Sequence, residues 1–501
     1  MTIRSAIPDA VPAPPAVPPG RFHFRLLAPG LLPGLVMLVL GLAAATRPVL
    51  SWDEVATADA AGPTYGQLWH LIPHIDAVFV SYYTLMHAWT SVAGHSVLAL
   101  RLPSILAMAA AVGLCGEFGR RRFGPLPGLL AGLLLAVLPN TSRYADEARP
   151  YAIACLFAVV ALLLLDRYLE RPGWGRLTAY GLAVLGLGLS HVLALCVLAG
   201  HVVIVLRARR ARGPWCGAVA AVLVLLAPLV WEGFRERHEQ LYWVPPVTIH
   251  SVLAMPGGVI GSQLVAALVL ELFGVALWRR PGPAVVETAA VAAAPALLVL
   301  AVSVAGASFW VPRYLLVVLA PAALVAAVGL VRLGAYAGRS GSPTPGRRRL
   351  RIVLVCLVAG AVAAPGQVAV RGQTSKNGSD WRTAAALIRQ NQQPGDTVVY
   401  TPHSRTLRAG LDAYLRDDPG RPRDVLLQES AARAGTLVAP EVRDPAGRLA
   451  GVRRVWLFVA GRHPDPTVVV PRLRGLLRTQ FAVIKLWPVH RGTLALYGRP
   501  R

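Results

Sequence analysis

Apolar runs recur along the chain from Leu31 to Ala364, and several are about 20 residues long, the length that spans a bilayer as a helix. Hydrophobic residues make up 55% of the sequence and charged residues 15%. Soluble proteins carry roughly 25% charged residues, so this chain is short of charge. The sequence therefore predicts an α-helical polytopic membrane protein and excludes a soluble globular enzyme.

The formal net charge of +25 comes almost entirely from arginine. In a soluble protein such an excess would indicate binding to nucleic acid. Here many of the arginines lie in short loops between apolar runs, which is how a membrane protein marks its cytoplasmic face. We therefore predict contact with the lipid bilayer and no nucleic-acid partner.

About eleven transmembrane helices are predicted, at 26–46, 97–118, 126–140, 148–166, 174–190, 191–206, 214–231, 257–278, 284–304, 314–331 and 351–368. Segment 74–93 differs from these. Its large apolar side chains, such as Phe79 and Trp89, recur at helical spacing, and polar ones such as His87 lie towards the other side. That pattern favours a helix lying in the membrane interface.

The arginine-rich loops orient the chain. With 74–93 in the interface, they all share the cytoplasmic face, as the positive-inside bias requires. Residues 1–25, rich in Pro and Ala, are then a disordered cytoplasmic tail. The predicted outer segments are 47–96, 140–148, the turn near 190, 232–256, 305–313 and everything after Val368.

Residues 369–501 are expected to form a separate extracytoplasmic domain of small α/β type, because helical and strand patterns alternate there. The expected elements are helices at 381–390, 406–415 and 471–478 and strands at 397–400, 455–459, 481–486 and 493–497. Acceptor binding, covering of an active site and contact with a partner all remain open as roles for this domain.

Charged groups that could carry chemistry occur in three of the outer segments. Asp53 and Glu54 directly follow the first membrane helix, where acidic residues also simply favour a helix start. Asp146 and Glu147 form the second group, which could equally be a salt-bridged loop. Arg313 opens a span as the third, where an arginine can also serve as an interfacial anchor.

Under the predicted orientation all three groups lie on one side of the membrane. A carboxylate there can take the proton from an acceptor hydroxyl. An arginine can hold a lipid phosphate and stabilise its charge as it leaves. No nucleotide-binding motif is visible, which fits an outer-face transfer reaction that uses a preactivated donor.

The motifs that carry these groups resemble, in their order, those of bacterial membrane glycosyltransferases of the GT-C fold. They are Trp52-Asp53-Glu54, an interfacial segment with Asp76 and Tyr82-Tyr83, Arg101-Leu102-Pro103-Ser104, Glu147-Ala148-Arg149-Pro150-Tyr151 and Arg313-Tyr314. The chain is most similar to the actinobacterial branch of the protein mannosyltransferase-like and aminoarabinose transferase-like superfamily. The likeness covers residues 26–340 and makes 26–368 a GT-C-like transmembrane domain with a catalytic outer loop at 47–96.

The resemblance implies a polyprenyl-phosphate sugar donor, transfer at the extracytoplasmic face and inversion at the anomeric carbon. It makes Asp53 the general base, with Glu54 and Glu147 as further catalytic candidates. The implied donor-phosphate residues are Arg149, Arg313, Tyr314 and His191, and the sugar or acceptor pocket would use Asp76, Asp146, Tyr82 and Tyr83. For His191 the alternative is a residue packed at a helix end.

Two points of the family pattern stay open. Some members use a divalent cation, and Asp53, Glu54, His70 and His74 are candidate ligands for Mg or Mn. The aminoarabinose branch has a lysine in the interfacial loop, where this chain reads Leu71-Ile72-Pro73-His74. Arginine or histidine is therefore expected to replace that phosphate contact.

The sequence thus predicts a glycosyltransferase of the bacterial plasma membrane. Its sugar would be of mannose or arabinofuranose type, and its acceptor a cell-envelope glycan, lipid or protein. The alternatives are a transporter or flippase of a lipid-linked or anionic substrate, and a scaffold that presents the C-terminal domain. A transporter would place charged or broken helices at mid-membrane, whereas the predicted span interiors are mostly uncharged.

Overall fold

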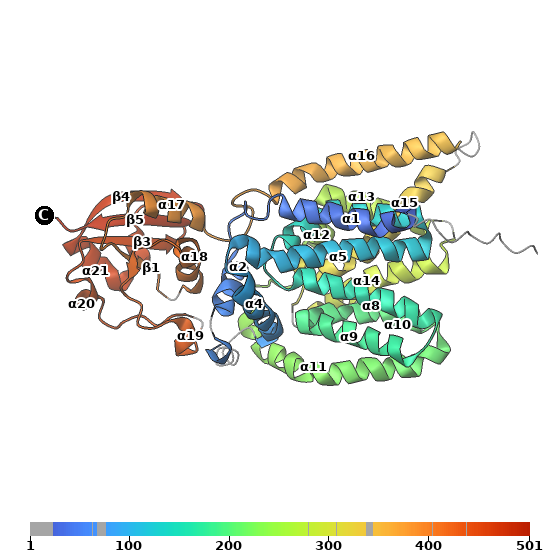
Figure 1. Cartoon of the computed structure of the whole chain (residues 1–501), viewed down its shortest axis with the longest axis horizontal. Helices are drawn as coiled ribbons and strands as arrows, with labels where there is room; N and C mark the ends of the chain where they lie inside the picture. The colour runs from blue at the N-terminus through green and yellow to red at the C-terminus, as the bar shows by residue number, and fades with distance from the viewer. Residues whose placement is uncertain are drawn as a thin grey trace, which may run out of the picture.

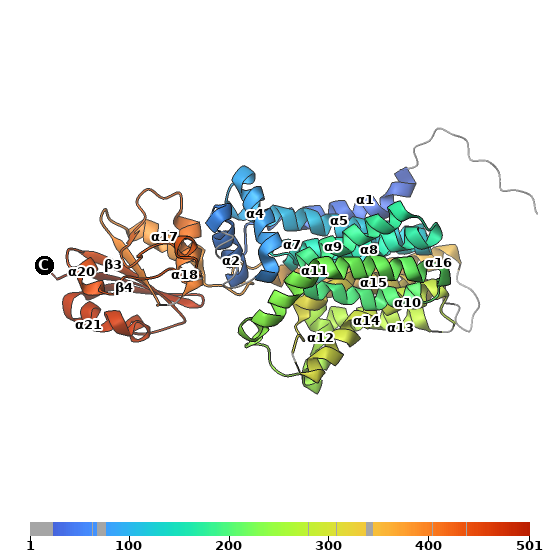
Figure 2. The same ribbon diagram turned by 90° about the horizontal axis from the view of Figure 1, so that it is seen from below.

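The computed structural model describes residues 24–500, except 63, 68–76, 279, 307, 337–343, 403 and 437. A bundle of long helices makes up one part, and a unit built on a β-sheet lies at one end of it (Figure 1). Helices α2 (Trp52–Ala61) and α4 (Val80–Ala93) lie between the two in both views (Figures 1 and 2).

The bundle consists of α1 (Phe24–Leu42), α5 (Val97–Phe123), α6 (Pro125–Val137), α7 (Pro139–Ala145), α8 (Tyr151–Glu170), α9 (Trp174–Ser190), α10 (Leu198–Val205), α11 (Arg212–Leu241), α12 (Ile249–Ile260), α13 (Gln263–Leu277), α14 (Pro283–Ala305), α15 (Leu319–Ala335) and α16 (Pro345–Ala369). Short 3-10 turns, η2 (Val192–Val197) and η4 (Pro312–Val318), precede α10 and α15. Among the described residues, six helices are long and apolar enough to cross a membrane, and two bent pairs would bring the number to eight. A multi-pass membrane protein is thereby confirmed, and the count of eleven spans stays a prediction.

Two of the predicted spans are wrong in detail. Segment 257–278 is not one helix, because α12 and α13 meet at a bend of 92°. Gly261 ends α12 in the left-handed region with φ of +93°, and a Cβ there would lie 2.8 Å from Asn140 Oδ1. Segment 126–140 also breaks, at Pro139, and the expected outer loop 140–148 begins as α7, bent by 66° from α6.

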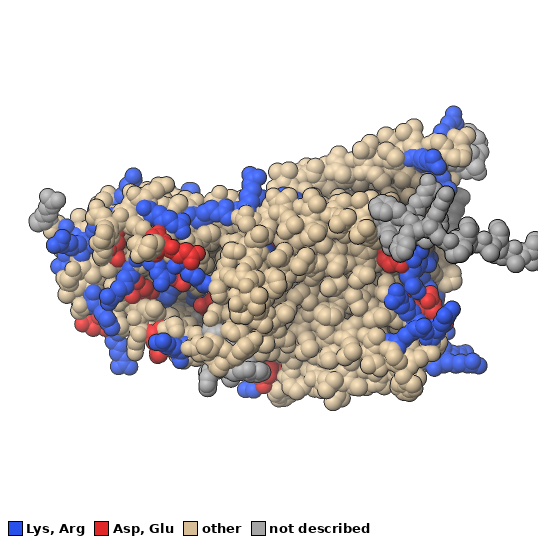
Figure 3. All heavy atoms as spheres, viewed as in Figure 1, with Lys and Arg blue, Asp and Glu red and all other residues tan. Residues whose placement is uncertain are grey.

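Charged residues on the face shown in Figure 3 gather at the sheet unit and at the opposite end of the bundle, with an almost uncharged belt between them. The arginines that end α5 form the ion pairs of the far end: Arg121 pairs with Glu170 at 2.9 Å and Arg122 with Asp166 at 3.2 Å. An uncharged belt is what contact with the hydrocarbon of a bilayer requires.

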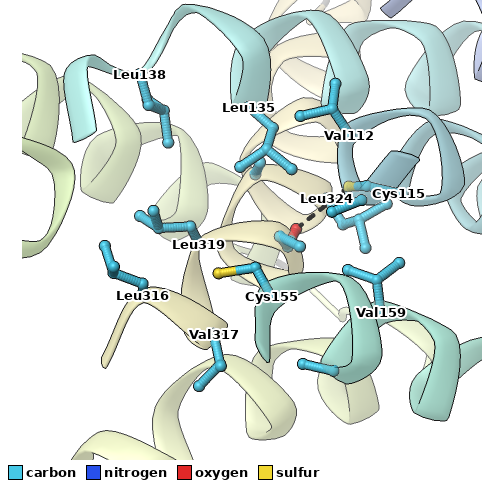
Figure 4. Packing of buried hydrophobic residues seen from close by; sticks show 14 of the residues in the cluster. Val112, Cys115, Leu135, Leu138, Cys155, Val159, Leu316, Val317, Leu319 and Leu324 are labelled. Atoms are coloured by element: carbon cyan, nitrogen blue, oxygen red, sulfur yellow. Dashed lines mark hydrogen bonds between the residues drawn. The ribbon is translucent and has the colours of Figure 1, made fainter. Parts of the chain in front are cut away.

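The core of the bundle lies between α5, α6, α8 and α15 (Figure 4). Val112, Leu135, Val159 and Leu324 pack there, and the buried thiol of Cys115 donates to the carbonyl of Ala320 at 3.7 Å. Small residues allow the helices to approach closely, as is usual in membrane bundles. This core fixes the positions of the helix ends that carry the polar residues described below.

The predicted interfacial helix is observed as the turn η1 (Ala77–Phe79) and α4, while its first three residues, 74–76, lie outside the described residues. One side of α4 buries Tyr82, Tyr83 and Met86 in the same cluster as residues of α2 and α5. A helical element is therefore confirmed over 77–93. Its placement along a bilayer surface stays a prediction.

The sheet unit, called the C-terminal unit below, follows α16. Its five strands run in the order β2-β1-β3-β5-β4, with β1 parallel to both β2 and β3 and with β5 antiparallel to β3 and β4. The strands are β1 (Thr397–Tyr400), β2 (Arg423–Asp424), β3 (Arg454–Ala460), β4 (Ala482–Val489) and β5 (Gly492–Gly498). The helices are α17 (Trp381–Asn391), α18 (Arg405–Leu415), α19 (Ala431–Ala434), α20 (Pro445–Leu449) and α21 (Pro471–Gln480).

Each strand and helix predicted in this unit is observed within three residues of its expected ends, and β2, α19 and α20 were not predicted because they are very short. Alternating residues of β3 face opposite layers, as the strand period of two requires. Trp456 and Phe458 pack on α17 and α18, whereas Leu457 packs on α21.

The C-terminal unit shares a core with the segment before and including α2. The buried Trp381 donates from Nε1 to the carbonyl of Leu50 at 3.0 Å, and Val49 donates to the carbonyl of Gln373 at 2.9 Å. Val55 of α2 lies in the same cluster of buried residues as Trp381. Helix α2 is therefore held from both sides, by the bundle and by the sheet unit.

Candidate active site

Helix α2 begins with a reciprocal cap. Glu54 N donates to Ser51 Oγ at 3.1 Å, and Ser51 N donates to Glu54 Oε2 at 2.9 Å. Such a capping box satisfies two backbone donors that a helix start would otherwise leave open. It also directs the Glu54 side chain inwards, where it is fully buried.

Arg101 of α5 meets Glu54 with two hydrogen bonds, Nε to Oε1 at 2.7 Å and Nη2 to Oε2 at 2.9 Å. Its remaining donors bind three carbonyls of the chain between α1 and α2, those of Ala45, Pro48 and Val49. The guanidinium group is fully buried and every one of its donors is used. Arg101 thus fastens the start of α2 to the bundle.

Lys376, which follows α16, completes this buried network. Its Nζ lies 3.0 Å from Glu54 Oε2 and also donates to the carbonyl of Asp146. Burial lowers the pKa of Lys376, with Arg101 adding to that effect. Burial alone would raise the pKa of Glu54, but the two cations hold it at about 2.

Sequence reasoning assigned no role to either cation. Arg101 belongs to a family motif that gives it no function, and Lys376 lies in the predicted C-terminal domain. The distance along the chain from Glu54 to Lys376 is 322 residues, so no local pattern could have paired them. The one available signal was that the chain has only two lysines, Lys376 and Lys485, among its 50 basic residues.

Asp53, the neighbour of Glu54, has the opposite environment. Its side chain is 40% exposed, and Oδ2 lies 3.8 Å from Nη1 of Arg313 at the start of η4. The Arg313 guanidinium lies over the ring of Trp243, 4.8 Å from its centroid, and 5.6 Å from that of Tyr314. The structure thus brings together two groups, predicted separately, as an accessible carboxylate beside an accessible guanidinium.

The second acidic group lies deeper. Ser51 Oγ donates to Glu147 Oε1 at 3.1 Å, and Arg143 Nε lies 3.9 Å from Glu147 Oε2. Burial raises the pKa of Glu147 and raises that of Asp146 to about 6, against the effect of Lys376. Both side chains are buried, and Glu147 contacts the cap of α2 through Ser51.

His191 lies among aromatic rings, 5.3 Å from Tyr314 and 5.4 Å from Tyr151 between ring centroids. Phe79 connects this group to Arg149, whose guanidinium carbon lies 4.2 Å from the centroid of the Phe79 ring. Two more of the predicted residues lie nearby. Arg149 Nη1 donates to Tyr83 Oη at 3.3 Å, and Tyr82 is buried beside Tyr83 on α4. Asp76, His70 and His74 lie outside the described residues.

A cavity of about 180 Å³ opens beside this aromatic group. Apolar side chains form most of its wall, among them Leu193, Phe234 and Phe309, while His191 and Tyr314 line one part and Arg237 another. Such a site can accept an apolar chain whose polar end remains among the cations and aromatic rings.

The donor set does not suit a metal ion at Glu54. Its two oxygens already accept hydrogen bonds from Ser51, Ala148, Lys376 and twice from Arg101. Within the described part of the chain, no three His, Cys, Asp or Glu side chains come together as a metal site. The candidate metal set that includes Glu54 therefore does not fit this arrangement.

Comparison with known proteins bears on the fold. A family model described as dolichyl-phosphate-mannose-protein mannosyltransferase matches residues 79–231. The crystal structure of ArnT from Cupriavidus metallidurans bound to undecaprenyl phosphate is similar with a TM-score of 0.57 and 16% identity, covering 92% of this chain and 96% of that one. Its apo state gives a TM-score of 0.58 at 15% identity over the same shares.

The arabinosyltransferase EmbB from Mycobacterium smegmatis has a TM-score of 0.45 and 15% identity, covering 78% of this chain and 43% of that one. No curated protein matches the chain by sequence. The chain therefore has the GT-C glycosyltransferase fold that its motifs indicate, and its residues 79–231 match the mannosyltransferase family model.

Proposed function

We propose that this chain is a membrane glycosyltransferase that moves a sugar from a polyprenyl-phosphate donor to a cell-envelope glycan, lipid or protein. The reaction would take place at the extracytoplasmic face of the bacterial plasma membrane. One observation carries the proposal: Asp53 lies 3.8 Å from Arg313, and His191 and Tyr314 connect this pair to an apolar cavity. The matched family model and the fold of ArnT, described as bound to undecaprenyl phosphate, support it.

In this mechanism Asp53 is the general base. The acceptor hydroxyl gives its proton to the carboxylate while its oxygen forms a bond to the anomeric carbon of the sugar. The bond between that carbon and the phosphate oxygen breaks, and its electron pair leaves with the polyprenyl phosphate. Attack from the side opposite the leaving group inverts the configuration.

Arg313 would stabilise the leaving phosphate. A guanidinium group binds phosphate through paired donors, and its charge offsets the negative charge that develops there. Tyr314 and His191 lie where they could contact the same phosphate, and Arg149 lies behind Phe79 in the same region. The apolar cavity would hold the first part of the lipid chain.

Asp53→Asn tests the proposal, because it keeps the side-chain shape and removes the base. Purified protein in lipid nanodiscs is offered radiolabelled polyprenyl-phosphate mannose and polyprenyl-phosphate arabinofuranose with a crude cell-envelope acceptor. Mannose is the first choice, because the matched family model names it. We expect wild type to consume one donor and Asp53→Asn to be at least about a hundredfold slower, the usual size of a general-base effect.

The matched control is Asp465→Asn, which removes an exposed carboxylate in the C-terminal unit. It should retain the wild-type rate. Consumption of neither donor, or equal rates for Asp53→Asn and wild type, would contradict the proposal. The transporter reading would then be tested by following the movement of a fluorescent lipid phosphate across the bilayer.

A further inference from the structure

The C-terminal unit contains a cavity of about 630 Å³. Its walls come from one side of α18, from the ends of β1 and β2 and from the loop after β2. This volume falls within the range of roughly 300 to 1,000 Å³ that ligand pockets occupy. We call this cavity the C-terminal groove.

The position of the groove within the sheet favours ligand binding. Tyr400 is the last residue of β1 and Asp424 the last of β2, and both line the groove. The two strands are parallel. In open α/β sheets, ligands bind beyond the carboxyl ends of the strands where the strand order reverses, and here it reverses at β1, which lies between β2 and β3.

The polar part of the groove alternates acids and arginines. Arg408 donates to Asp424 Oδ2 at 2.6 Å and to Glu441 Oε1 at 2.8 Å. Nearer the surface, Arg421 donates to Asp412 Oδ1 at 2.6 Å, and both side chains of this pair are about half exposed. Paired acids and arginines offer acceptors and donors side by side with little net charge.

The other part of the groove is apolar and includes Leu411, Leu427, Pro419 and Pro422. A sugar has the matching character, because its hydroxyl groups donate and accept while its ring faces are made of C–H groups. The lining holds four arginines and three aspartates. Each aspartate already pairs with one of these arginines, which leaves little charge to bind a polyanion. The lining therefore suits a neutral glycan.

The groove reaches the helix of the candidate base. Asp59 of α2 lines the groove, and Arg405 of α18 lies 3.6 Å from its Oδ2. Asp59 follows Asp53 by six residues, a distance of about 9 Å along a helix axis. The two side chains point to different sides of α2, so a molecule that reached both would bend around this helix and would need more than one sugar residue.

We propose that the C-terminal groove binds the part of a glycan acceptor that lies beyond the sugar receiving the transfer. This inference rests on the proposed function and specifies its acceptor as an oligosaccharide or polysaccharide. Short acceptors would then react without using the groove, and long ones would gain affinity from it.

The test uses the full chain in nanodiscs with two variants of the groove. Asp412→Ala removes one member of the exposed ion pair, and Ala439→Trp adds bulk to the lining. The matched control is Arg478→Gln, which breaks an equally exposed ion pair with Asp465 elsewhere in the same unit. The probes are linear hexasaccharides and disaccharides of mannose and of arabinofuranose, each with a fluorescent label.

We expect Asp412→Ala to raise the KM for one hexasaccharide about tenfold, the effect of losing a hydrogen bond to a charged group. Ala439→Trp should raise the same KM because its ring fills part of the groove. The KM for the disaccharide and the rate of donor hydrolysis should stay at wild-type values. Equal hexasaccharide KM values in wild type and in the groove variants would overturn the proposal that the groove binds the acceptor. Sugar transfer by wild type in the same assay would still support the proposed function.

Direct binding separates the two proposals further. Without donor, wild type should bind one hexasaccharide more tightly than its disaccharide, and the groove variants should lose that difference. Such a result supports the groove even if no donor is consumed. Failure of both hexasaccharides to bind, or tighter binding of an unglycosylated envelope peptide that the variants also weaken, would overturn it.

Discussion

At the scale of single residues, the main finding is the division between Asp53 and Glu54. They are neighbours in sequence, yet Glu54 is fully buried with cations on two sides, and Asp53 is accessible beside Arg313. A general base must reach the acceptor hydroxyl, which Glu54 cannot do from its position. We therefore propose that Glu54 holds α2 in place and that Asp53 accepts the proton.

Lys376→Met is expected to destabilise the protein strongly. It would leave Glu54 buried with one cation fewer, and removal of one partner from a buried ion pair costs about 3 to 5 kcal/mol. Thermal unfolding in detergent measures the effect. Lys376→Arg keeps the charge and should recover part of the loss, while Lys485→Met, at an exposed position on β4, should change little. An unchanged melting temperature for Lys376→Met would show that the ion pair between Lys376 and Glu54 does not stabilise the fold.

Asp146 should make stability depend on pH in the acidic range. Burial raises the pKa of its carboxyl group from an ordinary 3.8 to about 6. The folded protein then binds this proton more tightly than the unfolded chain, so stability falls as pH rises from about 4 to about 6. Asp146→Asn removes this titration. Across that window wild type should lose up to about 3 kcal/mol relative to the variant, measured by chemical unfolding at each pH, and parallel curves would refute the argument.

At the scale of elements, the close approach of helices α1 and α5 sets how these two helices pack. Gly116 of α5 lies so near α1 that a Cβ would come 1.8 Å from the carbonyl oxygen of Pro29. Backbone cannot yield as a flexible side chain can, so the two helices would have to separate. Arg101 lies on the same helix α5, so a shift of α5 away from α1 would also shift Arg101.

Gly116→Ala is therefore expected to cost about 3 kcal/mol, the upper part of the usual range for overpacking. Gly217→Ala in α11 is the matched control, because nothing lies within 4 Å of a Cβ there and alanine favours a helix. Melting temperatures of the two purified variants should move in opposite directions or differ by several degrees. Similar values would mean that α1 and α5 adapt without loss.

At the scale of the whole molecule, the C-terminal unit and the chain that leads to it contact the segment around the start of α2. Truncation after Arg371 removes Lys376 from Glu54 and Trp381 from Leu50. We expect the truncated chain to lose donor hydrolysis as well as sugar transfer, because α2 loses its support on one side. Size-exclusion chromatography and a donor-hydrolysis assay check this result. A monodisperse truncated chain that hydrolyses donor at the wild-type rate would show that α2 does not need the C-terminal unit for its support.

Much of the local structure could be predicted because it depends on periodicity and caps that lie within a few residues. Strand β1 has the predicted ends, and α17 begins at the predicted residue, with Asp380 as its cap. The break between α12 and α13 was not predicted, although Gly261, which ends α12, and Ser262, which caps α13, are local signals for a helix end and a helix start. In the site, residues near Asp53 and Arg313 were named because the arginine-rich loops predicted which segments share one face.

The sequence by itself determined a helical membrane protein and the helices and strands of its C-terminal unit, while the set of outer segments stays a prediction. Hydrophobic length, periodicity and the positive-inside bias are local or additive properties of the sequence, so they can be read from it without a structure. Only the tertiary structure decided that Asp53 is accessible while its neighbour Glu54 is buried, and that Lys376 pairs with Glu54. Those facts depend on burial and on partners hundreds of residues away, and charge inside a protein is stabilised by what surrounds it in space.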